Sequence, residues 1–173
     1  MNLKALPSLL PGVQTPKKAY FRIVAATHAA EMDETAHTVL YSWRYNPRGE
    51  FGVLYLSGSP ECAWREKLKQ VHGRPHDLPA QVVGTFEVGI FKCLDLTNAG
   101  VLTPLGLERE RLILPGDFQE TQELARQARR LGFEVLLAPS AVGADCVTLA
   151  VFKDKLAPPS YCLLKPGSVR SYP

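Results

Sequence analysis

The chain has 173 residues, of which 46% are hydrophobic and 21% charged, and a net charge of +3. This length and balance suit one globular domain and exclude a largely disordered chain. The small positive charge leaves room for an anionic small molecule, but a nucleic-acid surface needs a dense basic stripe, so we expect no direct nucleic-acid binding.

The four cysteines are scattered and form no C-x-x-C pair. This spacing favours a reducing compartment over a disulfide framework, and it argues against a zinc site. His72 and His76 are four residues apart, but a glycine and a proline lie between them and break the helix that would align them as ligands. We therefore expect no metal.

Residues 1–19 contain Pro7, Pro11 and Pro16 and are expected to form an irregular arm. The first two prolines interrupt the leucines of this region before an apolar core of signal-peptide length can form. No later stretch is long enough to span a membrane. The sequence therefore predicts a cytoplasmic protein without a membrane segment.

Strands are predicted for "AYFRIVA" (19–25) and "HTVLYSW" (37–43). "NPRGEFG" (46–52) is typical of a turn because it combines Asn-Pro with glycine. "FGVLYLS" (51–57) is apolar on both faces, which indicates an interior strand.

A helix is predicted from the N-cap Ser59 to about Val71. At ~100° per residue, Trp64 and Leu68 cluster with Val71 on one side, and Glu66 lies roughly opposite. Periodicity alone therefore makes the cluster the core face and leaves Glu66 exposed.

The second half predicts further strands and one strong helix. Residues 81–96 give one or two strands with a bend at a glycine, and "LERERL" within 97–116 indicates a short helical turn. "DFQETQELARQARRLG" (117–132) predicts the strongest helix, with a capping box from Asp117 to Glu120. "FEVLLAPS" (133–140) and "CVTLAVF" (146–152) are the closing strands.

Strands, helix, strands, helix and strands follow one another without the strict alternation of a doubly wound fold. This order predicts a single α+β domain with antiparallel or mixed sheets. We expect the domain to cover residues 20–155 and the Pro-rich tail, 156–173, to pack on it.

Familiar catalytic motifs are absent: there is no G-x-G-x-x-G after a strand, no P-loop and no G-x-S-x-G. Four residues remain. Arg44, Tyr55 and Glu66 are spaced by eleven (55 − 44 and 66 − 55), and Ser140 lies in "APSAVGADC". Each has an ordinary explanation, since most charged residues are solvated and a strand tyrosine is often part of a core.

Two blocks resemble the RES domain family: "WRYNPRGEFGVLYLSGSPECAWREKL", and "TQELARQARRLGFEVLLAPSAVGADCVTLAVF". The first resembles the family's G-R-W-N-x-x-G block, an apolar strand ending in Tyr and an Ala-x-x-Glu helix. Trp43 stands where the family has glycine, and Tyr45 where it has tryptophan. The second block resembles its strand ending in Pro-Ser, at Leu136–Ser140. The matched positions of the first block are Arg44, Asn46, Gly49, Tyr55, Ala63 and Glu66.

The resemblance implies an ADP-ribosyltransferase-like fold of split, mixed or antiparallel sheets with flanking helices. Characterised RES members are toxins of bacterial toxin–antitoxin pairs that destroy NAD⁺, some by phosphorolysis. The resemblance thus implies cleavage of the nicotinamide–ribose bond, with NAD⁺ as substrate, inorganic phosphate or water as the second reactant and no cofactor. It also implies a helix-turn-helix antitoxin as partner, and a homodimer stays open.

Carried over to this sequence, Glu66 would stabilise the oxocarbenium-like transition state and Tyr55 would stack on nicotinamide or shape its slot. Arg44 would hold the pyrophosphate or an incoming phosphate. Ser140 would contact the substrate or hold Glu66. The expected catalytic residues are thus Glu66, Arg44, Tyr55 and Ser140, and the expected substrate-binding residues are Arg22, Tyr45 and Asn46.

Two other functions fit the same residues. One is transfer of ADP-ribose to a protein or small acceptor, which would give a labelled product and little free ADP-ribose. The other is a non-catalytic binding module, favoured if Arg44 and Glu66 lie far apart with Glu66 in solvent.

Overall fold

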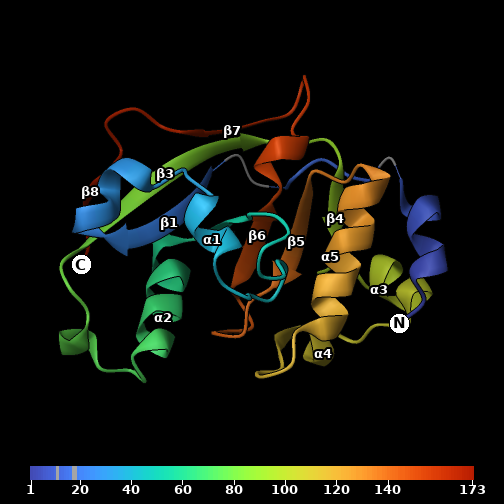
Figure 1. The fold of residues 1–173 in the computed structure, drawn as a ribbon, viewed down its shortest axis with the longest axis horizontal. Helices are drawn as coiled ribbons and strands as arrows, with labels where there is room; N and C mark the ends of the chain where they lie inside the picture. Colours follow the sequence, from blue (N-terminus) through green and yellow to red (C-terminus); the bar gives the residue numbers. More distant parts are fainter. Residues whose placement is uncertain (11, 17–18) are drawn as a thin grey trace.

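The structure is a computed structural model that describes residues 1–10, 12–16 and 19–173, and the predicted Pro11 break lies outside them. In this part of the chain, eight strands form one mixed sheet (Figure 1). The strands are β1 (Ala19–Ala25), β2 (Leu54–Ser57), β3 (Gln81–Gly89), β4 (Cys93–Asp95), β5 (Val135–Pro139), β6 (Val147–Val151), β7 (Tyr161–Leu164) and β8 (Arg170–Ser171).

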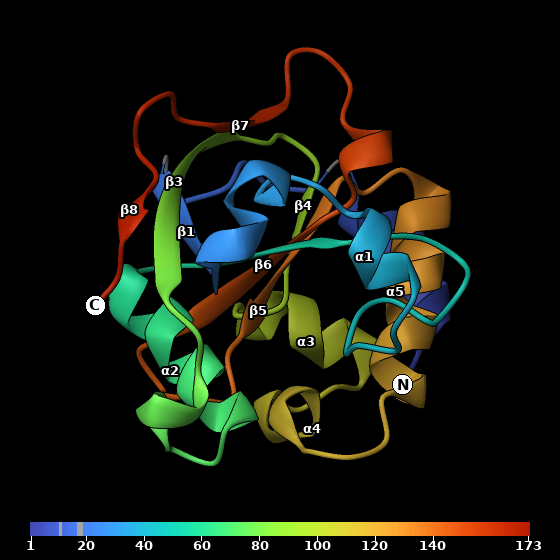
Figure 2. The same cartoon turned by 60° about the vertical axis from the view of Figure 1, so that its left-hand side comes forward.

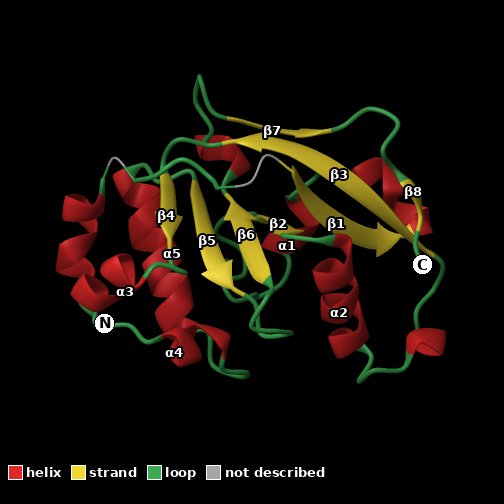
Figure 3. Cartoon of the chain, turned by 180° about the vertical axis from the view of Figure 1, so that it is seen from behind, coloured by secondary structure: helices red, strands yellow, loops and turns green. Residues whose placement is uncertain are grey.

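The helices gather at the two ends of the sheet. Figure 3, seen from behind, shows α2 near β1 and shows α3, α4 and α5 near β4 and β5. The α-helices are α1 (Ala36–Val39), α2 (Pro60–Gln70), α3 (Ala99–Leu105), α4 (Arg109–Ile113) and α5 (Gln119–Leu131). The 3-10 helices are η1 (Leu3–Leu9), η2 (Ala26–Glu31), η3 (Pro75–Asp77) and η4 (Lys153–Lys155).

The strand order is β4-β5-β6-β2-β1-β3-β7, with β8 also paired to β3. Only β4 and β5 run parallel among these pairs. Figure 2 shows β3 between β1 and the outer strands. The predicted mixed α+β fold is therefore confirmed.

The sheet has two halves that barely meet. β1 pairs with β3 along its whole length, from Ala19 to Ala25, but with β2 only where Phe21 lies opposite Ser57. β2 then continues into the other half through β6. Because pairing stops after one position, β1 and β2 diverge, and side chains of both strands are free to line a pocket.

Two clusters of buried side chains form the core, and the second of them joins the two halves. In the first, α5 packs Leu124 and Ala128 against β5, where Leu136 is fully buried. The second joins Tyr20 of β1 and Phe86 of β3 to the other face of β5 and β6. Both strands flanking the split are thus fixed by core packing.

Most predicted elements are found, including the strand 19–25, the helix from Ser59 and the closing strands. The strand predicted over 37–43 is wrong: this segment is α1 followed by turns. The Asn46 amide donates to the carbonyls of Thr38 (2.7 Å) and Tyr41 (3.0 Å), and the Thr38 hydroxyl accepts from Val53 N (2.9 Å). Side chains therefore satisfy polar groups that a strand would give to a neighbouring strand.

Two helix starts also differ from prediction. The capping box of α5 does not form, because α5 begins at Gln119 without a side-chain cap, and Asp117 accepts from Gln119 N at 2.8 Å. α3 was not predicted. Asn98 caps it by accepting from Gly100 N at 2.8 Å, and Gly106 ends it at φ +61°.

The N-terminal segment is less irregular than expected. η1 buries Leu6 completely in the first core cluster, and Asn2 N donates to Leu105 O at 2.6 Å. This burial is what orders the predicted arm. In the tail, β7 pairs with Phe86–Gly89 of β3 and extends the sheet.

Candidate active site

A pocket of about 380 Å³ lies beside the split between β1 and β2, a volume within the range of small-molecule sites. Its walls come from β1, α1, the loop before β2, β2, α2, the residue before α5, the end of β5 and the start of β6. Six of the seven predicted site residues line it: Arg22, Arg44, Tyr45, Tyr55, Glu66 and Ser140. The seventh, Asn46, does not.

Glu66 and Ser140 meet inside this pocket. The Ser140 hydroxyl donates a hydrogen bond to Oε1 of Glu66, and Ser140 is only 5% exposed. Val142 N donates to the same hydroxyl at 3.3 Å, so the serine is oriented from its own loop. Among the described residues the Glu66 carboxylate has no second hydrogen bond, which leaves Oε2 available to a ligand.

α2 presents Glu66 to the pocket, contrary to its periodicity. Ser59 caps the helix by accepting from Cys62 N at 3.1 Å. Its buried residues are Cys62 and Ala63, whereas Trp64 is half-buried and packs on Tyr172 with ring centroids 6.0 Å apart. The expectation of a Trp64-centred core face with an exposed Glu66 is therefore wrong.

Arg44 is fixed on another wall. Its guanidinium donates to the carbonyls of Leu114 (2.9 Å) and Ile113 (3.4 Å). The guanidinium carbon also lies 4.8 Å from the centroid of the Phe118 ring, a cation–π distance. The side chain is thus pre-oriented, and its remaining N–H groups can meet an anion.

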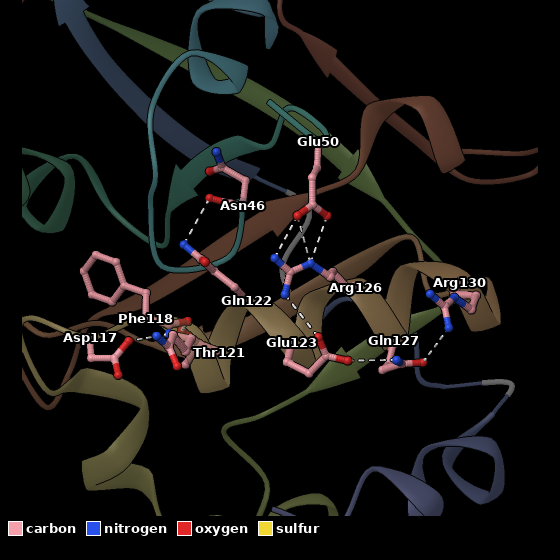
Figure 4. Close-up of polar contacts among 11 residues, drawn as sticks. Asn46, Glu50, Asp117, Phe118, Thr121, Gln122, Glu123, Arg126, Gln127 and Arg130 are labelled. Carbon is pink, nitrogen blue, oxygen red and sulfur yellow. Dashed lines mark hydrogen bonds and ion pairs between the residues drawn. The ribbon is translucent and has the colours of Figure 1, made fainter. Parts of the chain in front are cut away.

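The loop that carries Arg44 is anchored on α5 (Figure 4). The Gln122 amide donates to Ser42 Oγ and Trp43 O, both at 2.8 Å, and more weakly to Asn46 O at 3.4 Å. Thr121 donates to Arg44 O at 2.6 Å. α5 therefore sets the position of this wall, and Phe118, the residue before α5, lines the pocket.

Two residues of this loop hold the Tyr55 hydroxyl. The hydroxyl accepts from Tyr45 N (3.0 Å) and donates to Asn46 Oδ1 (2.9 Å). Burial raises the pKa of Tyr55, so the group is a neutral phenol at physiological pH. Asn46 is fully buried and outside the lining, so its visible role is to orient Tyr55 rather than to touch a ligand.

Arg22 is tied to the segment after η2. Its Nη1 donates to Met32 O (2.7 Å) and Glu34 O (3.1 Å). Burial lowers the pKa of Arg22, and Asp33 opposes this shift.

Sequence reasoning missed most of the other lining residues, among them Phe118, His37 and Lys67. Of these three, only Lys67 left a signal, because it lies four residues after Ala63 on the same helix face.

A disulfide joins α2 to the loop after β5, contrary to the expectation of unpaired cysteines. Cys62 and Cys146 are bonded with their Cα atoms 5.6 Å apart, and Arg65 pairs with Asp145 at 3.2 Å beside them. The two cysteines are 84 residues apart, so spacing could not reveal the pair. Asp145 lies close to both sulfurs, but a disulfide supplies no thiolate to a metal.

No helix in the described part of the chain is long and apolar enough to cross a bilayer.

Comparison with known proteins agrees with the predicted family. The chain is 38% identical over 112 residues to "Probable NAD(+) phosphorylase Rv3189" of Mycobacterium tuberculosis, a match that covers 63% of this chain and 52% of the relative. It thus spans about half of that relative's length. A chain of the M. tuberculosis MbcT-MbcA toxin-antitoxin complex has the same fold, with a TM-score of 0.74 at 19% identity over 98% of this chain and 91% of that one. The RES domain pattern itself matches residues 19–162, and the chain belongs to the RES domain family.

Proposed function

We propose that this protein cleaves the nicotinamide–ribose bond of NAD⁺ and transfers the ADP-ribosyl group to phosphate. The observation that carries the proposal is the Ser140–Glu66 hydrogen bond inside a pocket that also holds Arg44 and Tyr55. Family membership and the name of the 38% identical relative support the same reaction.

The chemistry needs one well-held carboxylate. As the C1–N bond breaks, both electrons pass to the ring nitrogen, so nicotinamide leaves as a neutral molecule and positive charge develops on the ribose. A carboxylate beside C1 stabilises this oxocarbenium-like state. Glu66 takes this role, and Ser140 fixes its orientation through Oε1 so that Oε2 faces the sugar.

The other predicted residues bind and orient the dinucleotide. Arg44 meets the pyrophosphate with the N–H groups that the carbonyls of Ile113 and Leu114 leave over. Tyr55 forms one side of the nicotinamide slot, because its ring lines the pocket while its hydroxyl is bound from behind.

The biological role we propose is that of a cytoplasmic toxin restrained by a helix-turn-helix antitoxin, as family membership implies. One surface feature supports a covering partner. Leu40 (63% exposed) and Tyr41 (51%) lie beside Trp43 (39%), which lines the pocket. The rings of Tyr41 and Trp43 are 6.2 Å apart and form one apolar rim.

Product analysis tests the reaction. Incubation of the full chain with NAD⁺ and phosphate should release nicotinamide and ADP-ribose 1″-phosphate. Glu66→Gln should lower the rate at least ~10²-fold, as loss of a key electrostatic group does. Glu61→Gln, on the same helix but exposed and outside the pocket, is the matched control. Absence of nicotinamide release would refute the proposal, and a labelled protein with little free product would indicate ADP-ribosyl transfer instead.

Induced expression tests the toxin role. The wild-type chain should deplete cellular NAD⁺ and arrest growth, and Glu66→Gln should do neither. Growth arrest that persists in the Glu66→Gln strain would mean that toxicity does not come from this site.

A further inference from the structure

α2 brings a lysine next to the proposed catalytic carboxylate. Ala63, Glu66, Lys67 and Gln70 all line the pocket, and their spacing places them on one helix face. Lys67 is half-buried, and no described residue forms an ion pair with it. The ammonium group therefore enters the pocket without a bound counter-charge.

Lys67 belongs to a group of basic side chains from three elements. Arg22 comes from β1, His37 from α1 and Lys67 from α2, and all three line the pocket. Burial lowers the pKa of Lys67, and the charge of Arg22 lowers it further. Burial is also the main cause that lowers the pKa of His37. The charge of Arg22 is the second cause, and His28 and Lys67 lower this pKa further. The positive charges of Arg22 and Lys67 repel one another in this hollow, and a bound anion would remove that cost.

This basic group is separate from Arg44. Arg44 is bound to carbonyls just after α4 and to Phe118 before α5, whereas Lys67 lies on α2. Figure 1 shows β6 between α2 and α4–α5, and Figure 3 shows both β2 and β6 between them. The pocket thus has two basic regions, and one pyrophosphate needs only one of them.

We propose that Lys67, together with Arg22 and His37, binds inorganic phosphate as the attacking group. Lys67 is then the residue that selects phosphate over water. This inference rests on the proposed function. Lys67 follows Glu66 directly on α2 and both residues line the pocket, so an anion bound by Lys67 shares the pocket with the carboxylate proposed to face C1 of the ribose.

The step balances without a further reactant. An oxygen lone pair of HPO₄²⁻ forms the bond to C1 while the C1–N bond breaks and its electrons pass to nicotinamide. The products are ADP-ribose 1″-phosphate and neutral nicotinamide. Unlike water, HPO₄²⁻ loses no proton, so the site needs a cation to hold the nucleophile and no general base beside it.

Lys67→Met tests the assignment because it keeps the length of the side chain and removes its charge. We expect the KM for phosphate to rise at least ~10-fold, since a charged donor is lost, and the product to shift toward free ADP-ribose. The KM for NAD⁺ should stay within about twofold. Lys67→Arg should recover part of the phosphate dependence, and Lys155→Met, exposed and outside the pocket, should behave as wild type.

Two results would overturn the inference. An unchanged KM for phosphate would remove Lys67 from the phosphate site. A higher KM for NAD⁺ with unchanged phosphate dependence would make Lys67 part of the pyrophosphate clamp.

Binding of inorganic phosphate without NAD⁺ gives a readout that does not depend on activity. Phosphate should raise the Tm of the wild-type chain and of Glu66→Gln, and should have a smaller effect on Lys67→Met. If the wild-type chain binds phosphate through Lys67 but releases no nicotinamide, the proposed function fails and the anion site stands. If nicotinamide is released while Lys67→Met keeps the full thermal shift, only the present inference fails.

Discussion

The hydroxyl of Ser140 donates to Oε1 of Glu66 across 74 residues of sequence. The bond joins the residue that follows β5 to the middle of α2, and both segments line the pocket. The Glu66 side chain turns about three rotatable bonds, so without this hydrogen bond its carboxylate would sample several rotamers. We therefore expect the serine to act on the proposed reaction through the orientation of Glu66.

Ser140→Ala should consequently slow the reaction without unfolding the protein. A hydrogen bond to a charged group contributes roughly 1.5–3 kcal/mol. If most of this orients Glu66 in the transition state, kcat should fall about 10- to 100-fold with little change in the KM for NAD⁺. Steady-state kinetics measure both values. Ser8→Ala, which removes an exposed hydroxyl bonded only to Ala5 O, is the control. A kcat equal to wild type would mean that Glu66 is held by something else.

Gln122→Ala should disturb the Arg44 wall from a distance. Gln122 is 8% exposed and donates to Ser42, Trp43 and Asn46, so its loss removes three hydrogen bonds between α5 and the loop that carries Arg44. We expect a loss of about 1–3 kcal/mol in the free energy of unfolding. The KM for NAD⁺ should rise several-fold because the Arg44 loop is no longer fixed.

Gln127→Ala is the matched control for that experiment. Gln127 lies on the same helix, but within the described part of the chain its side chain bonds only to Glu123 and Arg130 of α5 itself. Urea unfolding and kinetics should therefore show a small effect for Gln127→Ala. Equal effects of the two variants would argue that α5 acts only through its own helical stability.

Much of the fold follows from local patterns. Alternation and apolar runs are enough for β1 and β2, and the Ser59-Pro60 start and Gly132 stop are enough for two helices, because each signal acts within a few residues. The strand predicted over 37–43 is wrong because the structure of this segment depends on hydrogen bonds that Thr38 accepts from the Asn46 amide and from Val53 N. The periodicity of the sequence carries no information on these bonds.

The site, in contrast, does not follow from local sequence patterns. Nothing in the spacing of Arg44, Tyr55 and Glu66 requires them to share a pocket, and the helical periodicity of α2 contradicted it. Only resemblance to the RES family predicted the convergence, and it extends to the residues that match the family's motif. Lys67 lies outside that motif, and the Cys62–Cys146 bond depends on a contact between distant segments, so both required coordinates.

The Tyr55 phenol gives a pH-dependent prediction. Burial raises its pKa in the folded protein above the usual value of about 10. Its contribution to stability is therefore complete below about pH 10 and is lost at higher pH, where the unfolded chain ionises first. Tyr55→Phe removes this group and leaves Asn46 Oδ1 and Tyr45 N unpaired, so it should cost roughly 1–3 kcal/mol at pH 8.

The measurement is urea unfolding of wild type and Tyr55→Phe between pH 7 and 11. The difference between the two should be constant up to about pH 9.5 and shrink by about 1 kcal/mol by pH 11. Tyr45 is also buried, but it is present in both proteins and cancels. A difference that stays constant to pH 11 would mean that Tyr55 ionises equally easily in both states.

The Cys62–Cys146 bond should stabilise the fold. It should also keep Glu66 of α2 close to Ser140, because it joins α2 to the loop after β5. It closes a span of 84 residues, for which the chain-entropy account gives roughly 4 kcal/mol and measured values for disulfides are about 2–4 kcal/mol. Wild-type protein should therefore lose stability and part of its activity in a reducing agent, and the Cys62→Ser/Cys146→Ser double variant should match the reduced wild type.

The double variant is its own control, since its Tm and kcat should not respond to the reducing agent. Thiol titration of the denatured wild-type chain should find two free cysteines, Cys93 and Cys162, before reduction and four afterwards. Four free thiols in protein purified without reductant would show that the bond does not form under those conditions. The original expectation of a reducing compartment would then hold for this pair, and Arg65–Asp145 would be the polar contact left between α2 and the Ser140 loop.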